Sequence, residues 1–357
     1  MTRPAKVHIH LDAFRHNYRV AKQHHGGKAL AVIKANAYGH GAIACARAIE
    51  NETDGYAVAC IEEALQLRQA GIQHPILLLE GFFESSELPE IVAYDLWIVV
   101  HAIWQVEILL ASKLKTPVQV WLKMDSGMHR VGLSPEEYGD IYTKLMGHRN
   151  VSKIVCMSHF ANADNLDSQH TLAQLALFKS TMQSLQSEFS LANSAAILGW
   201  SQTHGNWARP GIMLYGADPL LNPNTPLRPV MQFTSQIIGI RPIKAGEAIG
   251  YGSMFKAARD TIVGVVACGY ADGYPRSASN LAPVAVNGKT TKLIGRVSMD
   301  MLFVDLTDIA DATIGSQVEL WGANILANEV AKAASTIAYE LFCNVKRAQF
   351  VYTDDAT

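Results

Sequence analysis

The chain has 357 residues, of which 49% are apolar and 17% charged, enough to build a large core in roughly two domains. Its net charge of −2 includes no long run of one sign, which argues against a nucleic acid as partner because duplex binding needs a basic face. The five cysteines are scattered without metal-ligand spacing, and the first residues contain no apolar core of an export signal. No run of apolar residues is long enough to span a membrane as a helix. A cytoplasmic protein without a bound metal and without a membrane partner is therefore expected.

Short apolar runs alternate with amphipathic helical patterns over the first part of the chain. One helix shows its start clearly: Ser134 is an N-cap residue, Pro135 suits the first turn and Glu137 completes a capping box. Strands that alternate with helices form a parallel sheet, and eight such units predict an α/β fold with a (β/α)8 barrel, or TIM barrel. A doubly wound open sheet is the alternative, because the last two strands have weak patterns. The expected strands span residues 30–34, 55–60, 75–81, 96–100, 117–125, 153–160, 191–195 and 206–211.

The pattern changes to a mostly-β one after a polar, proline-rich connection, "PLLNPNTPLRP". Strand-like runs follow, with a hairpin signal at Asn287–Gly288, and one helix is expected at about 326–342. We therefore predict a barrel domain over residues 10–225 and a C-terminal β domain over residues 226–357. Residues 1–9 alternate like a strand and are expected to pair with the β domain.

One lysine, Lys34, stands at the end of the first predicted strand, in "AVIKANAYGHG". In a barrel of this type the functional side chains lie at the carboxyl ends of the strands. A buried lysine readily loses its charge, and the neutral amine can form a Schiff base with an aldehyde. A lysine that only extends from the barrel rim to solvent is equally compatible with this segment.

Further polar and aromatic residues follow the later strands or stand in glycine-rich loops of the β domain. Each one alone has a structural explanation: His159 could be a core histidine, and Arg209 could form a surface ion pair. Lys123 could simply pair with Asp125. Their joint occurrence at successive strand ends indicates an active site instead. The candidates are Lys123, Arg130, His159, Ser194, Arg209, Tyr251, Tyr270, Met299 and Asp300.

The segments that hold these residues resemble the bacterial alanine racemases, fold-type III enzymes that use pyridoxal phosphate (PLP). The resemblance runs in family order through "AVIKANAYGHG", "LKMDSGMHRVG", "SHFANAD", "NSAA", "RPGIMLYG", "GYGSMF", "GYADGYPR", "GRVSMD" and "IAYE". It implies an isomerase that interconverts L-alanine and D-alanine, either for D-alanine biosynthesis and peptidoglycan or for L-alanine catabolism.

The resemblance also assigns the catalytic residues. Lys34 is similar to the lysine that forms the Schiff base with PLP, and Tyr251 to a second base on the opposite face of the substrate. Met299 and Asp300 are similar to residues at the substrate carboxylate, and Tyr270 to an entrance residue. In the family the last four come from the partner subunit, which implies a homodimer with shared active sites.

The remaining assignments concern the cofactor. Arg209 resembles an arginine at the PLP ring nitrogen, which can donate a hydrogen bond because arginine stays protonated. His159 resembles a support for that arginine, and Arg130 a contact of the phenolic oxygen and the substrate carboxylate. Lys123 resembles a lysine that carries a carbamate. The residues matched to the phosphate are Tyr38, Ser194, Tyr339 and the amides of Gly211 and Ile212.

Three alternatives differ from this hypothesis in their sequence signals. A racemase of broader specificity, for example for serine, usually has an export signal. A PLP-dependent decarboxylase should carry a glutamate-type partner for the ring nitrogen and a glycine-rich phosphate loop, whereas this chain has Arg209. A non-enzymatic PLP-carrier protein resembles the barrel alone and lacks a counterpart of residues 226–357.

Overall fold

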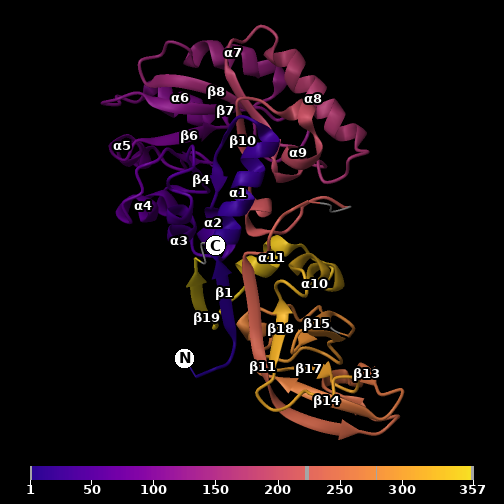
Figure 1. Ribbon diagram of the computed structural model, residues 1–357. Helices are drawn as coiled ribbons and strands as arrows, with labels where there is room; N and C mark the ends of the chain where they lie inside the picture. The colour runs from indigo at the N-terminus through magenta and orange to yellow at the C-terminus, as the bar shows by residue number, and fades with distance from the viewer. Residues whose placement is uncertain (1, 222–224, 279, 355–357) are drawn as a thin grey trace.

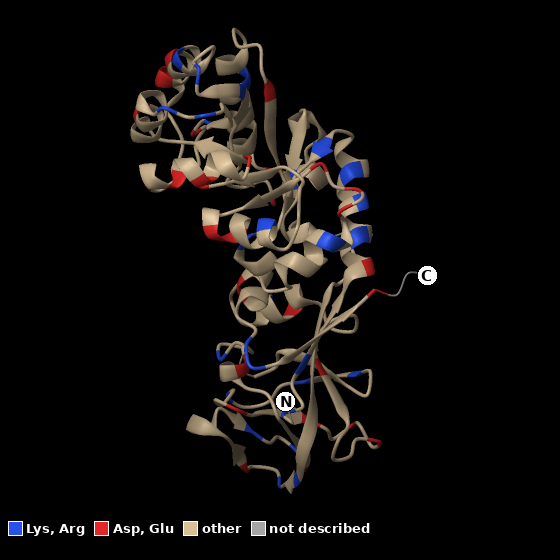
Figure 2. Ribbon diagram, turned by 90° about the vertical axis from the view of Figure 1, so that its left-hand side faces the viewer, with Lys and Arg blue, Asp and Glu red and all other residues tan. Residues whose placement is uncertain are grey.

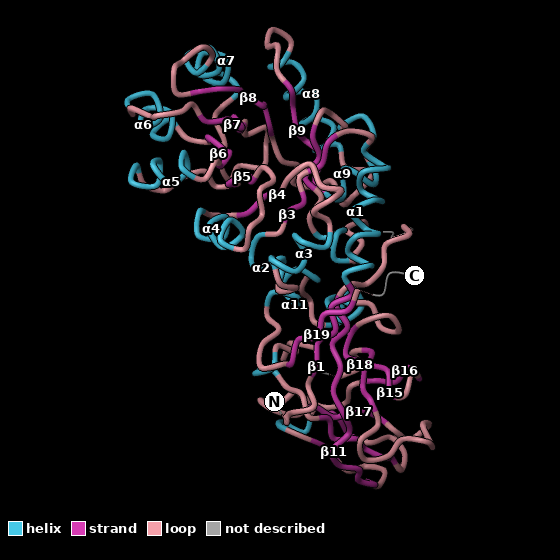
Figure 3. The backbone as a smooth tube through the Cα atoms, turned by 60° about the vertical axis from the view of Figure 1, so that its left-hand side comes forward, coloured by secondary structure: helices cyan, strands magenta, loops and turns pink. Residues whose placement is uncertain are grey.

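The protein consists of two parts that lie end to end, so that the molecule is elongated (Figure 1). The computed structural model describes residues 2–221, 225–278 and 280–354. A barrel surrounded by helices forms one part, and a β-rich assembly forms the other (Figure 3). Charged residues of both signs are interspersed along both parts (Figure 2). No helix in the described ranges is long and apolar enough to cross a bilayer.

The parallel sheet runs in the order β2-β10-β9-β8-β7-β6-β5-β4-β3. β2 and β3 are two halves of one extended run, and β2 pairs with the last strand, β10, while β3 pairs with β4. The first and last strands therefore meet, so the predicted (β/α)8 barrel is confirmed and the open sheet is wrong. The strands are β2 Lys28–Ala29, β3 Ala31–Val32, β4 Tyr56–Val58, β5 Ile76–Leu78, β6 Leu96–Val100, β7 Val118–Lys123, β8 Val151–Met157, β9 Glu188–Asn193 and β10 Trp207–Arg209.

Three tryptophans fill the barrel interior. Trp97 of β6, Trp121 of β7 and Trp207 of β10 have ring centroids 5.5, 5.7 and 6.2 Å apart. Because β7 and β10 are not neighbours in the sheet, Trp121 and Trp207 meet across the interior. The interior is thus a packed core, which leaves the carboxyl ends of the strands as the place for a ligand.

Helices follow the strands around the barrel. The predicted N-cap and first-turn proline are confirmed, since the Ser134 side chain accepts a hydrogen bond from the Glu137 amide and Pro135 opens α7. The Glu137 carboxylate accepts from the Ser134 hydroxyl, which is not the backbone contact of a capping box. The α-helices of this part are α1 Leu11–His25, α2 Lys34–Tyr38, α3 Ala42–Ala48, α4 Ile61–Gln69, α5 Leu88–Ala93, α6 Ile103–Ala111, α7 Pro135–Leu145, α8 Gln169–Met182 and α9 Ser194–Gly199. The short 3-10 helices are η1 Ser85–Glu87, η2 Ser201–Thr203 and η3 Ile212–Tyr215.

The second part is a mixed sheet in the order β16-β15-β18-β11-β1-β19, to which β14 and β17 are joined through β11. β1, from the N-terminal segment, pairs antiparallel with β11 and parallel with β19. The strands are β1 Lys6–His10, β11 Met231–Ile243, β12 Ala248–Ile249, β13 Phe255–Lys256, β14 Thr261–Val266, β15 Pro283–Val286, β16 Lys289–Lys292, β17 Leu302–Asp305, β18 Gln317–Trp321 and β19 Gln349–Thr353. The helices are α10 Ala327–Ala333, α11 Ala338–Cys343, η4 Tyr251–Ser253 and η5 Tyr270–Asp272.

Local expectations for this part had mixed outcomes. The hairpin at Asn287–Gly288 is confirmed, because it joins the antiparallel strands β15 and β16. The single helix expected at about 326–342 is wrong: α10 and α11 are separated by a turn in which Ser335 has a φ of +55°. The division into residues 10–225 and 226–357 stays a prediction, and the connection includes residues 222–224, which lie outside the described residues.

Candidate active site

Lys34 lies at the carboxyl edge of the barrel, where it opens an unusual left-handed turn. The next four residues, 35–38, have φ values of +51°, +53°, +54° and +50°. A left-handed conformation costs roughly 1–2 kcal/mol per residue without glycine, so other contacts must hold it. Glu63 of α4 supplies one, because its Oε1 accepts from the Ala35 amide at 2.6 Å, while its Oε2 accepts from the Ala59 amide after β4 at 2.7 Å. The turn thus fixes the backbone position from which the Lys34 side chain extends.

The turn ends against α11. Gly39 has a φ of +79°, and a Cβ there would overlap the carbonyl oxygen of Phe342. α2 and α11 lie side by side between the barrel and the β-rich part (Figure 3). The backbone of the Lys34 turn is therefore packed directly on a helix of the second part.

Gly39→Ala is expected to destabilise the protein by about 1–3 kcal/mol and to loosen the Lys34 turn, because it adds backbone strain and a steric overlap. Denaturant unfolding measures the loss. Gly71→Ala is the matched control, since Gly71 has a φ of +90° but nothing within 4 Å of a Cβ. Equal losses in the two variants would contradict the role given to the contact with α11.

Hydroxyl and amide groups gather beside this turn. The Ser194 hydroxyl accepts from the Gly211 amide at 2.8 Å. A Cβ on Gly211 would lie 2.8 Å from the Tyr38 hydroxyl oxygen, so only glycine leaves room there. The Tyr38 ring lies 5.6 Å from the Tyr339 ring, and burial raises the pKa of both phenols, that of Tyr339 to about 12. Protonated hydroxyls and amides, with Ile212 next in the chain, form a cradle that suits a phosphate.

Basic side chains from several strand ends meet at the same edge. Burial, the charges of Arg130 and Arg209 and, to a smaller extent, that of Lys34 lower the pKa of Lys123 to about 7. Burial lowers the pKa of His159 well below its usual range, and the charges of Arg209, Lys123, Arg130 and Lys34 lower it further, so its imidazole is neutral. Such a concentration of positive charge is costly without an anion. The site therefore fits a ligand with several negative groups.

The alternative in which Lys123 simply pairs with Asp125 is wrong. Within the described ranges, no ion pair includes Lys123. The carboxylate of Asp125 lies 3.3 Å from the His129 ring and accepts from the Gly127 and His129 amides. Lys123 is thus a buried amine with no described carboxylate in contact, although the nearby charge of Asp125 counteracts part of the fall in its pKa.

Arg209 is 4% exposed and is fixed by carbonyl groups. Its Nη1 donates to the Ser190 carbonyl at 2.9 Å, and its Nη2 donates to the Ser158 carbonyl at 2.6 Å. Among the residues that the structure describes, none accepts a hydrogen bond from its Nε. Burial lowers its pKa to about 10, so it stays protonated near neutrality. The free Nε–H suits an uncharged acceptor such as a ring nitrogen.

Of the candidates in the second part, Tyr339 lies in the cradle, whereas the other four lie apart from this cluster. Tyr251, Tyr270 and Met299 are 70%, 40% and 53% exposed. β13, which follows Tyr251 closely in the chain, lies in the half of the molecule away from the barrel (Figure 1). No hydrogen bond between described residues joins Tyr251, Met299 or Asp300 to a barrel residue. One chain therefore brings Lys34, Lys123, Arg130, His159 and Arg209 together, but not Tyr251.

Both parts of the chain match known proteins. The family model of the alanine racemase N-terminal domain matches residues 9–219, and that of the alanine racemase C-terminal domain matches residues 230–352. The chain belongs to the alanine racemase family. An alanine racemase of Pseudomonas taetrolens is 58% identical over 348 residues, 97% of this chain and 98% of the relative. A catabolic alanine racemase of Pseudomonas putida shares 58% over 348 residues, again 97% and 98% of the two chains.

Solved alanine racemases also share the fold. The biosynthetic enzyme of Pseudomonas aeruginosa superposes with a TM-score of 0.96 at 44% identity, over 99% of this chain and 100% of that chain. The enzyme of Bartonella henselae, which was solved with covalently bound pyridoxal phosphate, gives a TM-score of 0.90 at 31% identity, over 98% and 99% of the two chains. The predicted family and its barrel-plus-β architecture are thereby confirmed.

Two residues that support the site of this alanine racemase family member were not predicted. Glu63 reaches the Lys34 turn from α4, and Ser190 holds Arg209 from β9. Glu63 reads as an ordinary first-turn helix acid, and Ser190 as a strand residue. Neither carries a sequence signal that separates it from many similar residues.

Proposed function

We propose that this chain interconverts L-alanine and D-alanine with PLP as its cofactor. The observation that supports this most is the group of basic side chains at the barrel edge, next to the cradle at Ser194 and Gly211. PLP carries a phosphate and a phenolic oxygen, and its amino-acid substrate adds a carboxylate, so the negative groups match the basic ones. The name shared by the relatives supports alanine as the substrate.

The residues at the barrel edge suffice to hold the cofactor. When bound, PLP withdraws electrons from the α-carbon of an attached amino acid and so makes its α-proton acidic. Lys34 would bind it covalently through Nζ, and Arg209 would donate its free Nε–H to the ring nitrogen, with the neutral His159 as the residue that supports this arginine. The phosphate would be bound by Tyr38, Ser194, Gly211, Ile212 and Tyr339.

Racemisation requires that a proton leave one face of the α-carbon and arrive at the other. We assign the first face to the Lys34 amine, which takes the α-proton of D-alanine. The opposite face is assigned to Tyr251 of the partner subunit, which takes that of L-alanine. In each direction one of the two groups removes the proton and the other donates one to the opposite face. The direction of net conversion therefore follows the ratio of the two alanine concentrations. The enzyme can thus supply D-alanine for peptidoglycan or L-alanine for catabolism.

The shared site makes the protein a homodimer. Arg130 would bind the substrate carboxylate from one chain, while Met299 and Asp300 approach it from the other and Tyr270 lines the entrance. The separation of Tyr251 from the barrel within one chain supports this arrangement. Exposed apolar side chains in loops after the barrel strands, such as Phe83 and Val131, would be covered by the second copy.

The compartment proposed is the cytoplasm. All five cysteines are free, and two of them, Cys60 and Cys343, are not fully buried. Free thiols persist where the surroundings are reducing.

Lys123 is predicted to form a carbamate with CO2 as the pH rises through about 7, because the neutral amine is the reactive form and the pKa of Lys123 is about 7. The carbamate would place an anion beside Arg130 and orient it. Labelled bicarbonate and 13C NMR measure it: the signal should grow with pH and be absent in Lys123→Ala. A wild type without signal above neutral pH excludes the modification. Without CO2, the lowered pKa means that the unfolded chain binds more protons between about pH 7 and 10.5, so stability from this residue rises with pH there.

Chiral chromatography tests the proposed activity. The purified protein with PLP should convert L-alanine to an equal mixture of L- and D-alanine, and do the same from D-alanine. Serine is the comparison substrate for breadth. Unchanged alanine after incubation of a PLP-loaded protein would rule out the proposal.

A further inference from the structure

A buried carboxylate lies under the entrance residue of the proposed site. Asp272, the last residue of η5, has no exposed surface. Its two oxygens accept from Arg3, with Nε at 2.9 Å and Nη2 at 2.6 Å, and the second also accepts from the Gly269 amide at 2.9 Å. A buried carboxylate persists only when it is paired and hydrogen-bonded in this way.

The same cluster reaches the loop that follows β16. Arg3 donates from Nη2 to the Asp300 carbonyl at 2.7 Å, and Arg347 donates from Nη2 to the Asp300 carboxylate at 2.8 Å. The Arg347 Nε lies 3.6 Å from Asp272. The charges thus tie together the N-terminal segment, η5, the Asp300 loop and the residues before β19, which are far apart in the sequence.

The backbone of η5 rests directly on that loop. The Tyr270 amide donates to the Ser298 carbonyl at 3.0 Å, and the Ala271 amide donates to the Met299 carbonyl at 3.0 Å. A Cβ on Gly269 would overlap both of these carbonyl groups. The backbones of Tyr270 and Met299 are therefore joined in one unit, and Asp272 is the charged group that lies beneath it.

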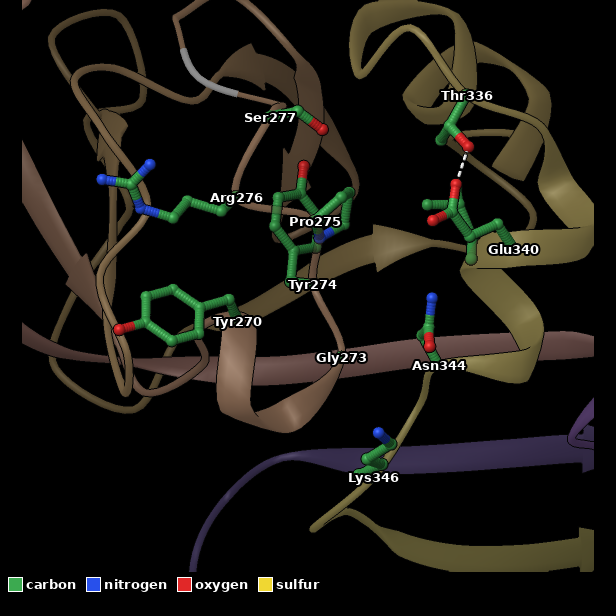
Figure 4. Close-up of a pocket in the computed structure, with 11 residues that line it drawn as sticks. Tyr270, Gly273, Tyr274, Pro275, Arg276, Ser277, Thr336, Glu340, Asn344 and Lys346 are labelled. Atoms are coloured by element: carbon green, nitrogen blue, oxygen red, sulfur yellow. Dashed lines mark hydrogen bonds between the residues drawn. The ribbon is translucent and has the colours of Figure 1, made fainter.

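The side of the unit that faces α11 is only partly packed. A cavity of about 320 Å³ lies between the residues that follow η5 and α11 (Figure 4). Its walls include Pro275, Arg276 and Ser277 on one side and Glu340 and Asn344 on the other. On that side η5 is held by the charge cluster and by one backbone hydrogen bond, which the Lys346 amide donates to the Asp272 carbonyl at 2.8 Å.

We propose that Asp272, held by Arg3 and Arg347, is a positioning residue that places Met299 and Tyr270 for the active site of the second copy. The inference rests on the shared site of the proposed function. It predicts that loss of the Asp272 charge weakens substrate binding: KM for alanine rises about 10-fold, while kcat falls less, because the proton-transfer groups stay in place. The effect acts on the partner's site and not on the chain's own Lys34.

A mixed dimer with one working site tests this directly. One chain carries Tyr251→Phe and the other Lys34→Ala, each with its own affinity tag, so the working site combines Lys34 of the first with Tyr251 of the second. Asp272→Asn on the Lys34→Ala chain should raise KM about 10-fold, whereas on the Tyr251→Phe chain it should leave KM unchanged. Because both dimers have the same composition, a general loss of stability cannot produce this difference.

Equal KM values in the two placements overturn the inference while the proposed function stands. An inactive parent mixed dimer alongside an active wild type overturns the shared site and this inference together. If the Asp272→Asn chain does not assemble, Arg3→Ala is placed on each of the two chains in the same way, because Arg3 is partly exposed and its replacement leaves no buried gap. Arg259→Ala is the matched control, because Arg259 pairs with Asp308 at 2.5 Å on the exposed surface of the same part and should not change KM in either placement.

Discussion

Replacing Lys34 by alanine is expected to lower kcat for alanine racemisation by about 10⁴-fold or more, because the change removes both the covalent attachment of PLP and one proton-transfer group. The variant should also lose the visible absorbance that PLP gains when it is bound covalently to the protein. Racemase assays and absorbance spectra of protein reconstituted with PLP measure the two effects.

Lys28→Ala is the matched control for this substitution. Lys28 begins the same extended run, at the amino-terminal end of the barrel, where its ammonium lies 4.9 Å from the centre of the Trp207 ring. It should keep both activity and absorbance. A Lys34→Ala protein that racemises alanine normally would remove Lys34 from the reaction.

Replacing Tyr251 by phenylalanine is expected to slow racemisation by about 10²–10⁴-fold, the usual contribution of a positioned acid or base. Both directions should slow equally, since each needs a proton at the Tyr251 face and the reaction is reversible. PLP binding should be retained. The Lys34 face stays intact, so exchange of the α-deuteron of D-alanine with solvent should continue without inversion.

Mass spectrometry of deuterated D-alanine, combined with chiral chromatography, separates exchange from inversion. Tyr94→Phe serves as the control, because Tyr94 is another partly exposed tyrosine and follows α5, away from the β-rich part. Loss of exchange to the same extent as inversion in Tyr251→Phe would contradict two separate proton-transfer groups.

The barrel could be predicted because its strands are short and buried. A strand buried on both faces is a nearly continuous apolar run, and each expected run overlaps an observed strand, including the weak ones near 191–195 and 206–211. The left-handed turn at residues 35–38 could not be predicted, because only Asn36 among its residues favours positive φ, whereas Ala35, Ala37 and Tyr38 do not. The end of α10 was missed for the same reason, because Ser335 has a positive φ that serine rarely adopts.

The part of the site that lies at the ends of successive barrel strands could be predicted from the sequence. Lys34, Lys123, His159 and Arg209 each stand at or just after the end of a barrel strand, so closing the barrel brings them together. Charge clusters such as Arg3 with Asp272 join residues 269 positions apart, and no local pattern carries that pairing. The roles taken from the resemblance stay predictions until variants are assayed.

The central claim is that each active site combines Lys34 of one chain with Tyr251 of the other. An equimolar mixture of Lys34→Ala and Tyr251→Phe chains, allowed to exchange subunits and checked by native mass spectrometry, tests it. Random pairing gives half mixed dimers with one working site each, so the racemase activity should recover to about a quarter of the wild-type value. Mixed dimers that form and yet remain as inactive as the separate variants would contradict the account.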